Sequence, residues 1–215
     1  MLTTKRLKEI KKKLSSDVSL VVVSKTRSNE EILEIYKNEQ MIFGENKVQE
    51  LIKKHEELPK DIQWHMIGHL QTNKVKYIAK FISLIHTVDS IKLINEINKR
   101  ALNENRIIDC LLQIHIAKEK NKFGFKINEI ENVIERSKNL KNINIIGLMG
   151  MATFSKNQDD IKKEFENLNK EFEKKKSKDF NTLSMGMSND YKIAIQNGST
   201  MIRLGSSIFG PRNLL

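Results

Sequence analysis

A lysine and a set of possible anion-binding turns lie at opposite ends of the sequence. Near its start, the apolar run at residues 21–24 leads directly into Lys25. A lysine at the end of an apolar strand is partly desolvated, and desolvation favours the neutral amine that attacks aldehydes. Taken alone, Lys25 would be better interpreted as a side chain that extends from a strand end into solvent.

Near the end of the sequence, two turns can bind an anion. Ser188 is placed to cap a helix that stops at residues 197–198, and the first N–H groups of such a helix have no internal partner. Residues 205–207 offer further backbone N–H groups, and the glycine allows close approach. Two ordinary turns are the alternative, but together they favour a phosphate site. A phosphate site beside a desolvated lysine would suit a phosphorylated aldehyde.

Short runs of apolar and β-branched residues alternate with longer stretches of helical periodicity. We expect strands over residues 20–24, 41–43, 62–67, 84–88, 110–116, 143–149, 182–185 and 201–204. Helices are expected over residues 29–37, 90–102, with Ser90 as its cap, and 160–176, and a leading helix precedes the first strand.

This alternation predicts one domain over residues 1–215, folded as a single (β/α)8 TIM-type barrel with an additional N-terminal helix. An open doubly wound sheet is the structural alternative. In a closed barrel the last strand lies beside the first, which would bring Arg203 close to Lys25. The barrel would also gather at its C-terminal mouth the polar residues that follow the strands, namely Lys25, Glu45, Asn46, His69, Asp89, Lys118, Ser188, Arg203, Gly205 and Ser206.

Composition argues against several other classes of protein. The net charge of +11 would suit a nucleic-acid-binding protein, but the lysines are dispersed and no aromatic residues alternate with them. We therefore expect solvated helix faces and no nucleic-acid partner. No apolar run is long enough to cross a bilayer, and the first residues do not resemble a secretory signal. The single cysteine, Cys110, fits a buried core residue in a reducing cytoplasm.

A metal site is also not expected. His65 and His69 are four residues apart, but no carboxylate or cysteine pattern completes a ligand set around them.

The motifs together resemble the pyridoxal phosphate homeostasis protein family, whose fold is similar to the N-terminal barrel of alanine racemase. The resemblance runs from about residue 21 to residue 212. It rests on VVVSKT around Lys25, FGENKVQE from Phe43, WHMIGHLQTNK from Trp64, HTVDS from His86, GLMGM from Gly147, LSMGMSNDYKIAI from Leu183 and GSTMIRLGSSIFGPR from Gly198.

The resemblance implies a site for pyridoxal 5′-phosphate (PLP). Lys25 would form the Schiff base and Arg203 would face the pyridine nitrogen. Asn46 would line the ring pocket, and the phosphate would be held by Ser188, Gly205 and Ser206.

Three further positions bear on the finer contacts of this site. Lys122 matches a family lysine near the mouth. His69 stands where many relatives have proline, and Lys47 stands where an aromatic residue is frequent. The last two are departures from the family pattern, and they leave the PLP-binding motifs unchanged.

The implied function is a PLP carrier or regulator in vitamin B6 and amino-acid or keto-acid homeostasis, without catalytic residues. Barrel racemases take a second acid–base group from an additional domain, and none is expected here because the printed sequence ends at Leu215. Expected partners are PLP and apo forms of PLP-dependent enzymes, with the protein monomeric, cytoplasmic and not bound to membranes. The alternative is a stand-alone, racemase-like enzyme of PLP fold type III that acts on amino acids.

Overall fold

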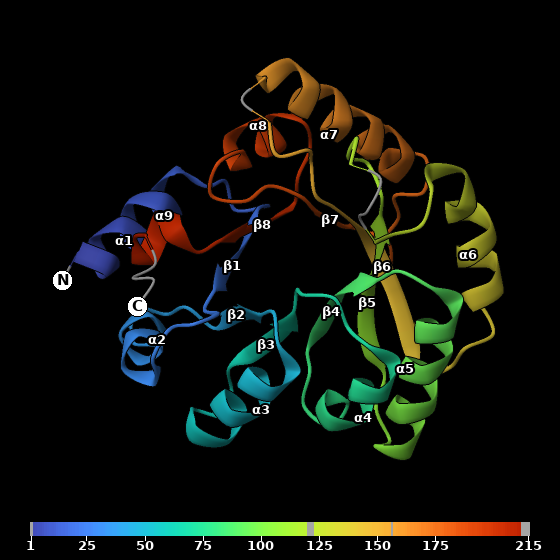
Figure 1. The fold of residues 1–215 in the computed structure, drawn as a ribbon, viewed down its shortest axis with the longest axis horizontal. Coiled ribbons are helices and arrows are strands. Elements are labelled where there is room, and N and C mark those ends of the chain that lie inside the picture. The colour runs from blue at the N-terminus through green and yellow to red at the C-terminus, as the bar shows by residue number, and fades with distance from the viewer. Residues whose placement is uncertain (1, 120–122, 156, 212–215) are drawn as a thin grey trace.

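The chain folds into a closed barrel of eight parallel strands in sequential order, surrounded by helices (Figure 1). The structure is a computed structural model that describes residues 2–119, 123–155 and 157–211. β1 pairs with β8 as well as with β2, so the sheet has no open edge. This closure confirms the predicted barrel and excludes the open doubly wound alternative.

The eight strands lie close to the predicted runs. The fourth and eighth have the predicted bounds, whereas the fifth begins and ends earlier than predicted. It ends earlier because the backbone N–H of His115 bonds to Phe125 and not to the neighbouring strand. The strands are β1 (Ser19–Val23), β2 (Ile42–Glu45), β3 (Gln63–Met66), β4 (Leu84–Val88), β5 (Ile108–Ile114), β6 (Ile143–Gly150), β7 (Thr182–Ser184) and β8 (Met201–Leu204).

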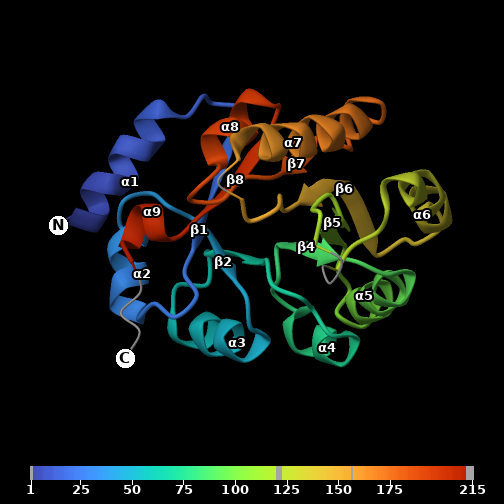
Figure 2. The same ribbon diagram turned by 45° about the horizontal axis from the view of Figure 1, so that its top comes forward.

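Helices cover the outside of the barrel, and the predicted N-terminal helix packs against the last helix, as both views show (Figures 1 and 2). Ser90 caps its helix as predicted, because its side chain accepts a hydrogen bond from the N–H of Leu93. The helices are α1 (Leu2–Lys13), α2 (Asn29–Tyr36), α3 (Val48–Glu57), α4 (Val75–Ile78), α5 (Ile91–Asn103), α6 (Ile130–Ser137), α7 (Gln158–Glu173), α8 (Tyr191–Gln196) and α9 (Ser206–Phe209). None of the helices in the described ranges is long and apolar enough to span a bilayer.

Side chains inside the barrel form layers of different chemistry. One layer is apolar and is built from Val21, Leu84, Leu111, Met149 and Met201. Two residues farther along β4 and β8, the layer nearer the C-terminal mouth contains polar side chains, including His86 and Arg203. The apolar layer fills the interior, so the polar groups above it have access only to the mouth.

Candidate functional site

A cavity of about 470 Å³ opens at the C-terminal mouth of the barrel. This volume is within the range of roughly 300–1,000 Å³ that is usual for small-molecule sites. All six residues predicted to bind the cofactor line this cavity, namely Lys25, Asn46, Ser188, Arg203, Gly205 and Ser206. They come from the ends of strands at both extremes of the sequence, and the β1–β8 pairing brings them together.

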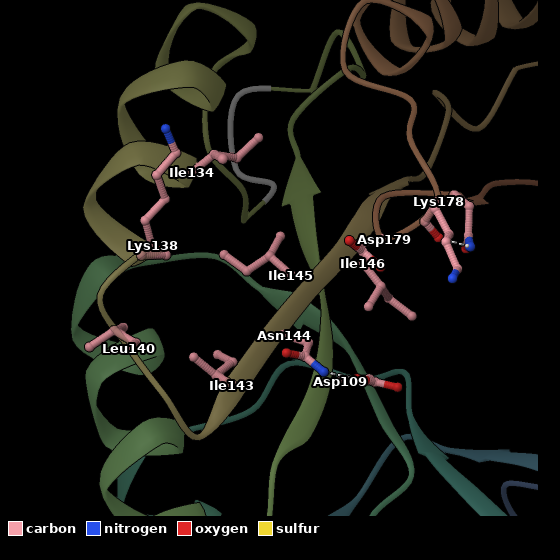
Figure 3. Close-up of a pocket in the computed structure, with 12 residues that line it drawn as sticks. Asp109, Ile134, Lys138, Leu140, Ile143, Asn144, Ile145, Ile146, Lys178 and Asp179 are labelled. Atoms are coloured by element: carbon pink, nitrogen blue, oxygen red, sulfur yellow. Dashed lines mark hydrogen bonds between the residues drawn. The ribbon is translucent and has the colours of Figure 1, made fainter.

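A larger cavity of about 580 Å³ lies beside α6 and the start of β6 (Figure 3). It contains none of the predicted site residues. Asn144 donates a hydrogen bond of 3.1 Å to Asp109 there, so two of its polar side chains pair with each other. It is also at the opposite end of β6 from the mouth, where barrels do not carry their active sites.

The turns after β7 and β8 are joined through one hydroxyl. Ser188 Oγ accepts hydrogen bonds from the backbone N–H groups of Gly205, at 3.4 Å, and Ser207, at 3.3 Å. Ser207 Oγ in turn donates to the carbonyl of Ser188 at 3.4 Å. These long, weak bonds converge on a point where an anion could take the place of the hydroxyl.

The prediction that Ser188 caps the following helix is wrong. α8 begins at Tyr191, and Asp190 occupies the cap position. The Asp190 carboxylate accepts a 2.6 Å hydrogen bond from the N–H of Met187, which holds a turn ahead of the helix and delays its start. The predicted stop at residues 197–198 is confirmed, with Gly198 in the left-handed conformation at φ +88°.

Arg203 forms the buried floor of the cavity and is only 4% exposed. Its guanidinium donates to the carbonyl oxygens of Ser184, at 3.0 Å, and Gly150, at 3.1 Å. Burial lowers the pKa of Arg203 to about 10, and the nearby charge of Asp190 opposes this shift. Arg203 therefore remains a cation at neutral pH.

A chain of buried polar side chains continues from Arg203 into the barrel. Arg203 also donates to Ser184 Oγ, which lies 3.0 Å from His86 Nδ1, and His86 Nε2 lies 3.0 Å from His65 Nδ1. Burial lowers the pKa of His65 to about 3 and that of His86 well below its usual value, so both imidazoles are neutral. We call Arg203, Ser184, His86 and His65 the Arg203 chain.

The first hydrogen bond of the Arg203 chain has a fixed direction. A guanidinium only donates, so the Ser184 hydroxyl accepts from Arg203. The directions of the Ser184–His86 and His86–His65 hydrogen bonds follow from the tautomers of the two neutral imidazoles. Local sequence patterns did not predict this chain, and they raised His65 only as a possible metal ligand. The described residues contain no cluster of potential metal ligands.

Not all of the predicted mouth residues line the cavity. Glu45 is buried on the outer side of the barrel, where it accepts hydrogen bonds from Lys54 of α3 and from Ser24, whereas its neighbour Asn46 lines the cavity. His69 pairs with Asp89 at 3.1 Å and stacks on Phe123, and Lys118 pairs with Asp160 at 2.9 Å. His69, Asp89 and Lys118 are absent from the cavity lining.

The family resemblance also singled out two lysines. Lys47 is exposed at the start of α3, and Lys122 lies outside the described residues.

Side chains that were not predicted also line the cavity, and some of them could have been identified from the GLMGM and SMGMSND motifs. They include Arg27, Met151, Thr153, Phe154, Met187, Asn189 and Asp190.

Comparisons with known proteins agree with this geometry. Residues 3–213 match the family model described as alanine racemase, N-terminal domain. The chain is 38% identical over 198 residues to the pyridoxal phosphate homeostasis protein of Aquifex aeolicus, covering 90% of this chain and 86% of the relative.

Two solved structures of PipY from Synechococcus elongatus also match, each over 97% of this chain and 100% of PipY. The structure without PLP gives a TM-score of 0.92 at 31% identity, and the structure with PLP bound gives 0.88 at 30%. The chain belongs to the pyridoxal phosphate homeostasis protein family, whose members carry the fold of the alanine racemase N-terminal domain.

Proposed function

We propose that this protein binds PLP in the mouth cavity, as a Schiff base on Lys25, and serves vitamin B6 homeostasis. The observation that carries the proposal is that all six predicted cofactor residues line this one cavity. Family membership and the PLP-bound relative support it independently.

The described residues fit each part of the cofactor. The N–H groups gathered at Ser188 can bind the phosphate, and Gly205 leaves its own N–H accessible. Arg203 can donate to the pyridine nitrogen, and Asn46 lies on the cavity wall for contact with the ring. When bound, PLP supplies an aldehyde carbon that the amine of Lys25 can attack.

We further propose a carrier or regulator and not an enzyme. Racemisation needs an acid–base group on each face of the ring. Among the described residues, the ionisable side chains that line the cavity are Lys25, Arg27, Asp190 and Arg203. Asp190 already accepts a hydrogen bond from Met187, and a cationic Arg203 would keep the ring nitrogen unprotonated, which weakens the cofactor as an electron sink.

The carrier proposal includes the remaining expectations about partners and location. We propose a monomeric, cytoplasmic protein of one domain that passes PLP to apo forms of PLP-dependent enzymes and does not bind nucleic acid.

The second candidate, a racemase-like enzyme, is favoured by the family model's description as an alanine racemase domain. Exchange of the α-proton for deuterium across the common amino acids separates the two. Turnover of about 1 per second or faster on any of them would favour the enzyme.

The binding proposal is tested by reduction with borohydride after incubation with PLP, followed by peptide mass mapping. We expect loss of the visible absorption band and one phosphopyridoxyl adduct, on Lys25. The Lys25→Ala variant should form no specific adduct, whereas Lys47→Ala, which alters an exposed lysine outside the cavity, should behave as wild type. An adduct mainly on another lysine would contradict the proposal.

A further inference from the structure

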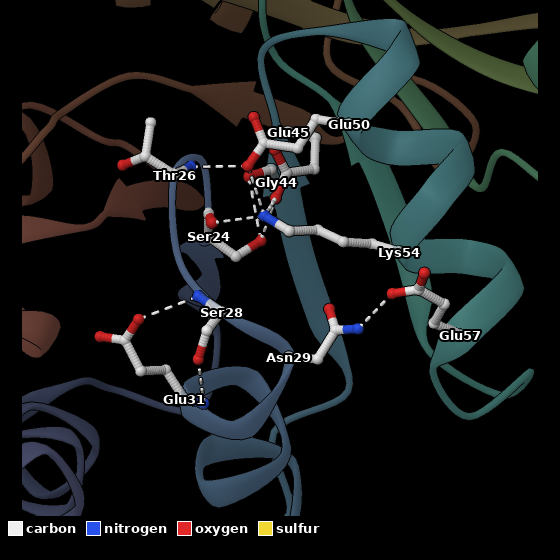
Figure 4. Close-up of polar contacts among 10 residues, drawn as sticks. All are labelled: Ser24, Thr26, Ser28, Asn29, Glu31, Gly44, Glu45, Glu50, Lys54 and Glu57. Carbon is white, nitrogen blue, oxygen red and sulfur yellow. Dashed lines mark hydrogen bonds and ion pairs between the residues drawn. The ribbon is translucent and has the colours of Figure 1, made fainter.

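A buried ion network lies directly behind the segment that carries Lys25, outside the cavity (Figure 4). Lys54, on α3, donates to Glu45 at 2.8 Å, to Glu50 at 2.6 Å and to the backbone carbonyl of Ser24 at 2.8 Å. Glu45 is fully buried and Lys54 is only 5% exposed. We call Ser24, Thr26, Glu45, Glu50 and Lys54 the Lys54 network.

The Lys54 network holds the residue on each side of Lys25. Before it, Ser24 donates its hydroxyl to Glu45 at 2.6 Å, and its carbonyl accepts from Lys54. After it, the backbone N–H of Thr26 donates to Glu50 at 2.6 Å. Figure 4 shows these contacts converging on the turn after β1 from two elements, α3, which carries Glu50 and Lys54, and the end of β2, which carries Glu45. The backbone on both sides of Lys25 is thus fixed to α3, and Ser24 is also held by β2.

The conformation of Thr26 shows that this turn needs support. Its φ of +65° lies in the left-handed region, which residues other than glycine, asparagine and aspartate seldom adopt. Such a conformation persists only where its surroundings impose it. Glu50 provides the acceptor for the Thr26 N–H in this conformation, and that acceptor ties the strained residue to α3.

Burying the charged groups of the Lys54 network has a desolvation cost. Burial raises the pKa of Glu45, which opposes the lowering by Lys54, and Glu45 Oε2 has no hydrogen-bond partner in the described structure. Apolar side chains could fill the same volume without this desolvation cost. Apolar groups could not accept from the Thr26 N–H or donate to the Ser24 carbonyl, and these directional contacts are what the charged groups supply.

We propose that Glu50 and Lys54 are positioning residues for Lys25. They fix the backbone at residues 24 and 26, so that the amine of Lys25 meets the aldehyde of bound PLP at a reactive angle. This inference rests on the proposed Schiff base at Lys25. Reaction rates depend steeply on such alignment, and a displacement of about 1 Å can slow a reaction on the order of a hundredfold.

The test compares Glu50→Ala with Glu50→Gln in the full-length protein. The alanine variant removes the acceptor for Thr26, whereas the glutamine side chain keeps an oxygen that can accept. The rate of covalent capture is followed by quenching with borohydride at set times and counting adducts on Lys25. Affinity for pyridoxine 5′-phosphate is measured in parallel, because this compound has the ring and phosphate but no aldehyde.

We expect Glu50→Ala to slow capture on Lys25 on the order of tenfold, with pyridoxine 5′-phosphate affinity within about twofold of wild type. Glu50→Gln should restore most of the rate. Glu57→Ala is the matched control, because Glu57 lies exposed on the same helix and its one hydrogen bond in the described structure is accepted from Asn29, outside the Lys54 network. It should capture PLP at the wild-type rate.

Lys54 is tested with a double variant, Glu45→Gln with Lys54→Met, which removes both fully or nearly fully buried charges together and leaves only the partly exposed Glu50, which still accepts from the Thr26 N–H. Its urea unfolding curve establishes that it folds, and we expect slowed capture with retained pyridoxine 5′-phosphate binding.

Three outcomes would overturn the inference. Unchanged capture in Glu50→Ala would show that Lys25 needs no such support. An equal loss of capture and of pyridoxine 5′-phosphate binding would show a general structural role. Failure of the wild-type protein itself to form an adduct on Lys25 would refute the proposed function and this inference together.

Discussion

Two buried polar networks support the mouth cavity, and they differ in how they deal with charge. The Lys54 network, behind Lys25, joins one ammonium to two carboxylates on the outer side of the barrel. The Arg203 chain lies inside the barrel and joins one cation to a hydroxyl and two neutral imidazoles. In the described residues, the guanidinium of Arg203 hydrogen-bonds to no carboxylate.

The difference in how the two networks pair their charges corresponds to a difference in what each network controls. Behind Lys25, ion pairing fixes the backbone, and the charges are kept out of the cavity. Beneath Arg203, carbonyl oxygens hold the guanidinium without neutralising it, so its positive charge remains directed at the cavity. A carboxylate in that position would favour a protonated ring nitrogen. We infer that one network controls position and the other controls the local electrostatic potential.

The largest effect is expected from Arg203→Met. This change leaves the buried carbonyls of Ser184 and Gly150 without their donor, and unpaired buried acceptors cost about 1–3 kcal/mol each. We expect the free energy of unfolding, measured with urea, to fall by about 2–6 kcal/mol, together with weaker PLP binding. Arg27→Met is the control, because Arg27 lines the same cavity but lies outside the Arg203 chain, where it pairs with Glu31 at 3.2 Å and donates to one backbone carbonyl, that of Gly210. Equal losses of stability and of PLP binding in the two variants would show that the buried contacts of Arg203 contribute no more than those of Arg27.

A smaller effect is expected at the phosphate end. Ser206→Ala should weaken PLP binding by roughly ten- to a hundredfold, because a hydrogen bond to a charged group contributes about 1.5–3 kcal/mol. Affinity for pyridoxal, which lacks the phosphate, should not change. Absorbance titrations with both compounds measure the difference. Equal weakening for both would mean that Ser206 acts on the ring or on the fold.

The Arg203 chain also predicts a pH dependence of stability. His65 and His86 are neutral when folded, but each binds a proton when unfolded below about pH 6.5. The unfolded state then holds more protons, so stability falls as the pH drops from about 6.5 towards the lowered folded pKa values. Each histidine contributes about 1.4 kcal/mol per pH unit in this window. The free energy of unfolding of His86→Asn, measured with urea at several pH values, should fall less steeply with decreasing pH than that of wild type. An unchanged pH dependence would contradict the assignment of His86 as neutral in the folded protein.

The smallest effect is expected at the rim. Lys118 and Asp160 form an exposed ion pair outside both networks, and such pairs contribute about 0–1 kcal/mol. Lys118→Ala should therefore leave both urea stability and PLP affinity close to wild type. A loss of PLP affinity above tenfold would place Lys118 in the binding site and extend the site beyond the cavity described above.

The sequence predicted the barrel and the cavity residues for a shared reason. Strand ends and turn residues leave local signals, and the match to family motifs assigned roles to Lys25 and Arg203. Neighbouring residues show the limit of such signals. Glu45 and Asn46 are adjacent, yet Glu45, the last residue of β2, bonds to α3, whereas Asn46, in the bend that follows, lines the cavity.

The remaining errors arose from contacts between distant residues. The Arg203 chain joins four strands, and only the closed barrel brings its four side chains into hydrogen-bonding distance. Ser188 seemed a good helix cap because the bond from Met187 to Asp190 has no signature that distinguishes the two candidate caps. Both features depend on geometry that the local pattern does not contain.

The pairing of β1 with β8, in which Val21 lies opposite Arg203, also bears on how the protein is made. A ribosome releases Lys25 early and Arg203 late, so the two sides of the cavity meet only when the last strand has left the exit tunnel. A ligand that requires both sides binds the folded chain and not the nascent one, and it stabilises the folded state by an amount that grows with the logarithm of its concentration once this exceeds the Kd. Cellular PLP would thus act as a clamp between the first and last strands, and the supply of the vitamin would shift the balance between folded and unfolded chains.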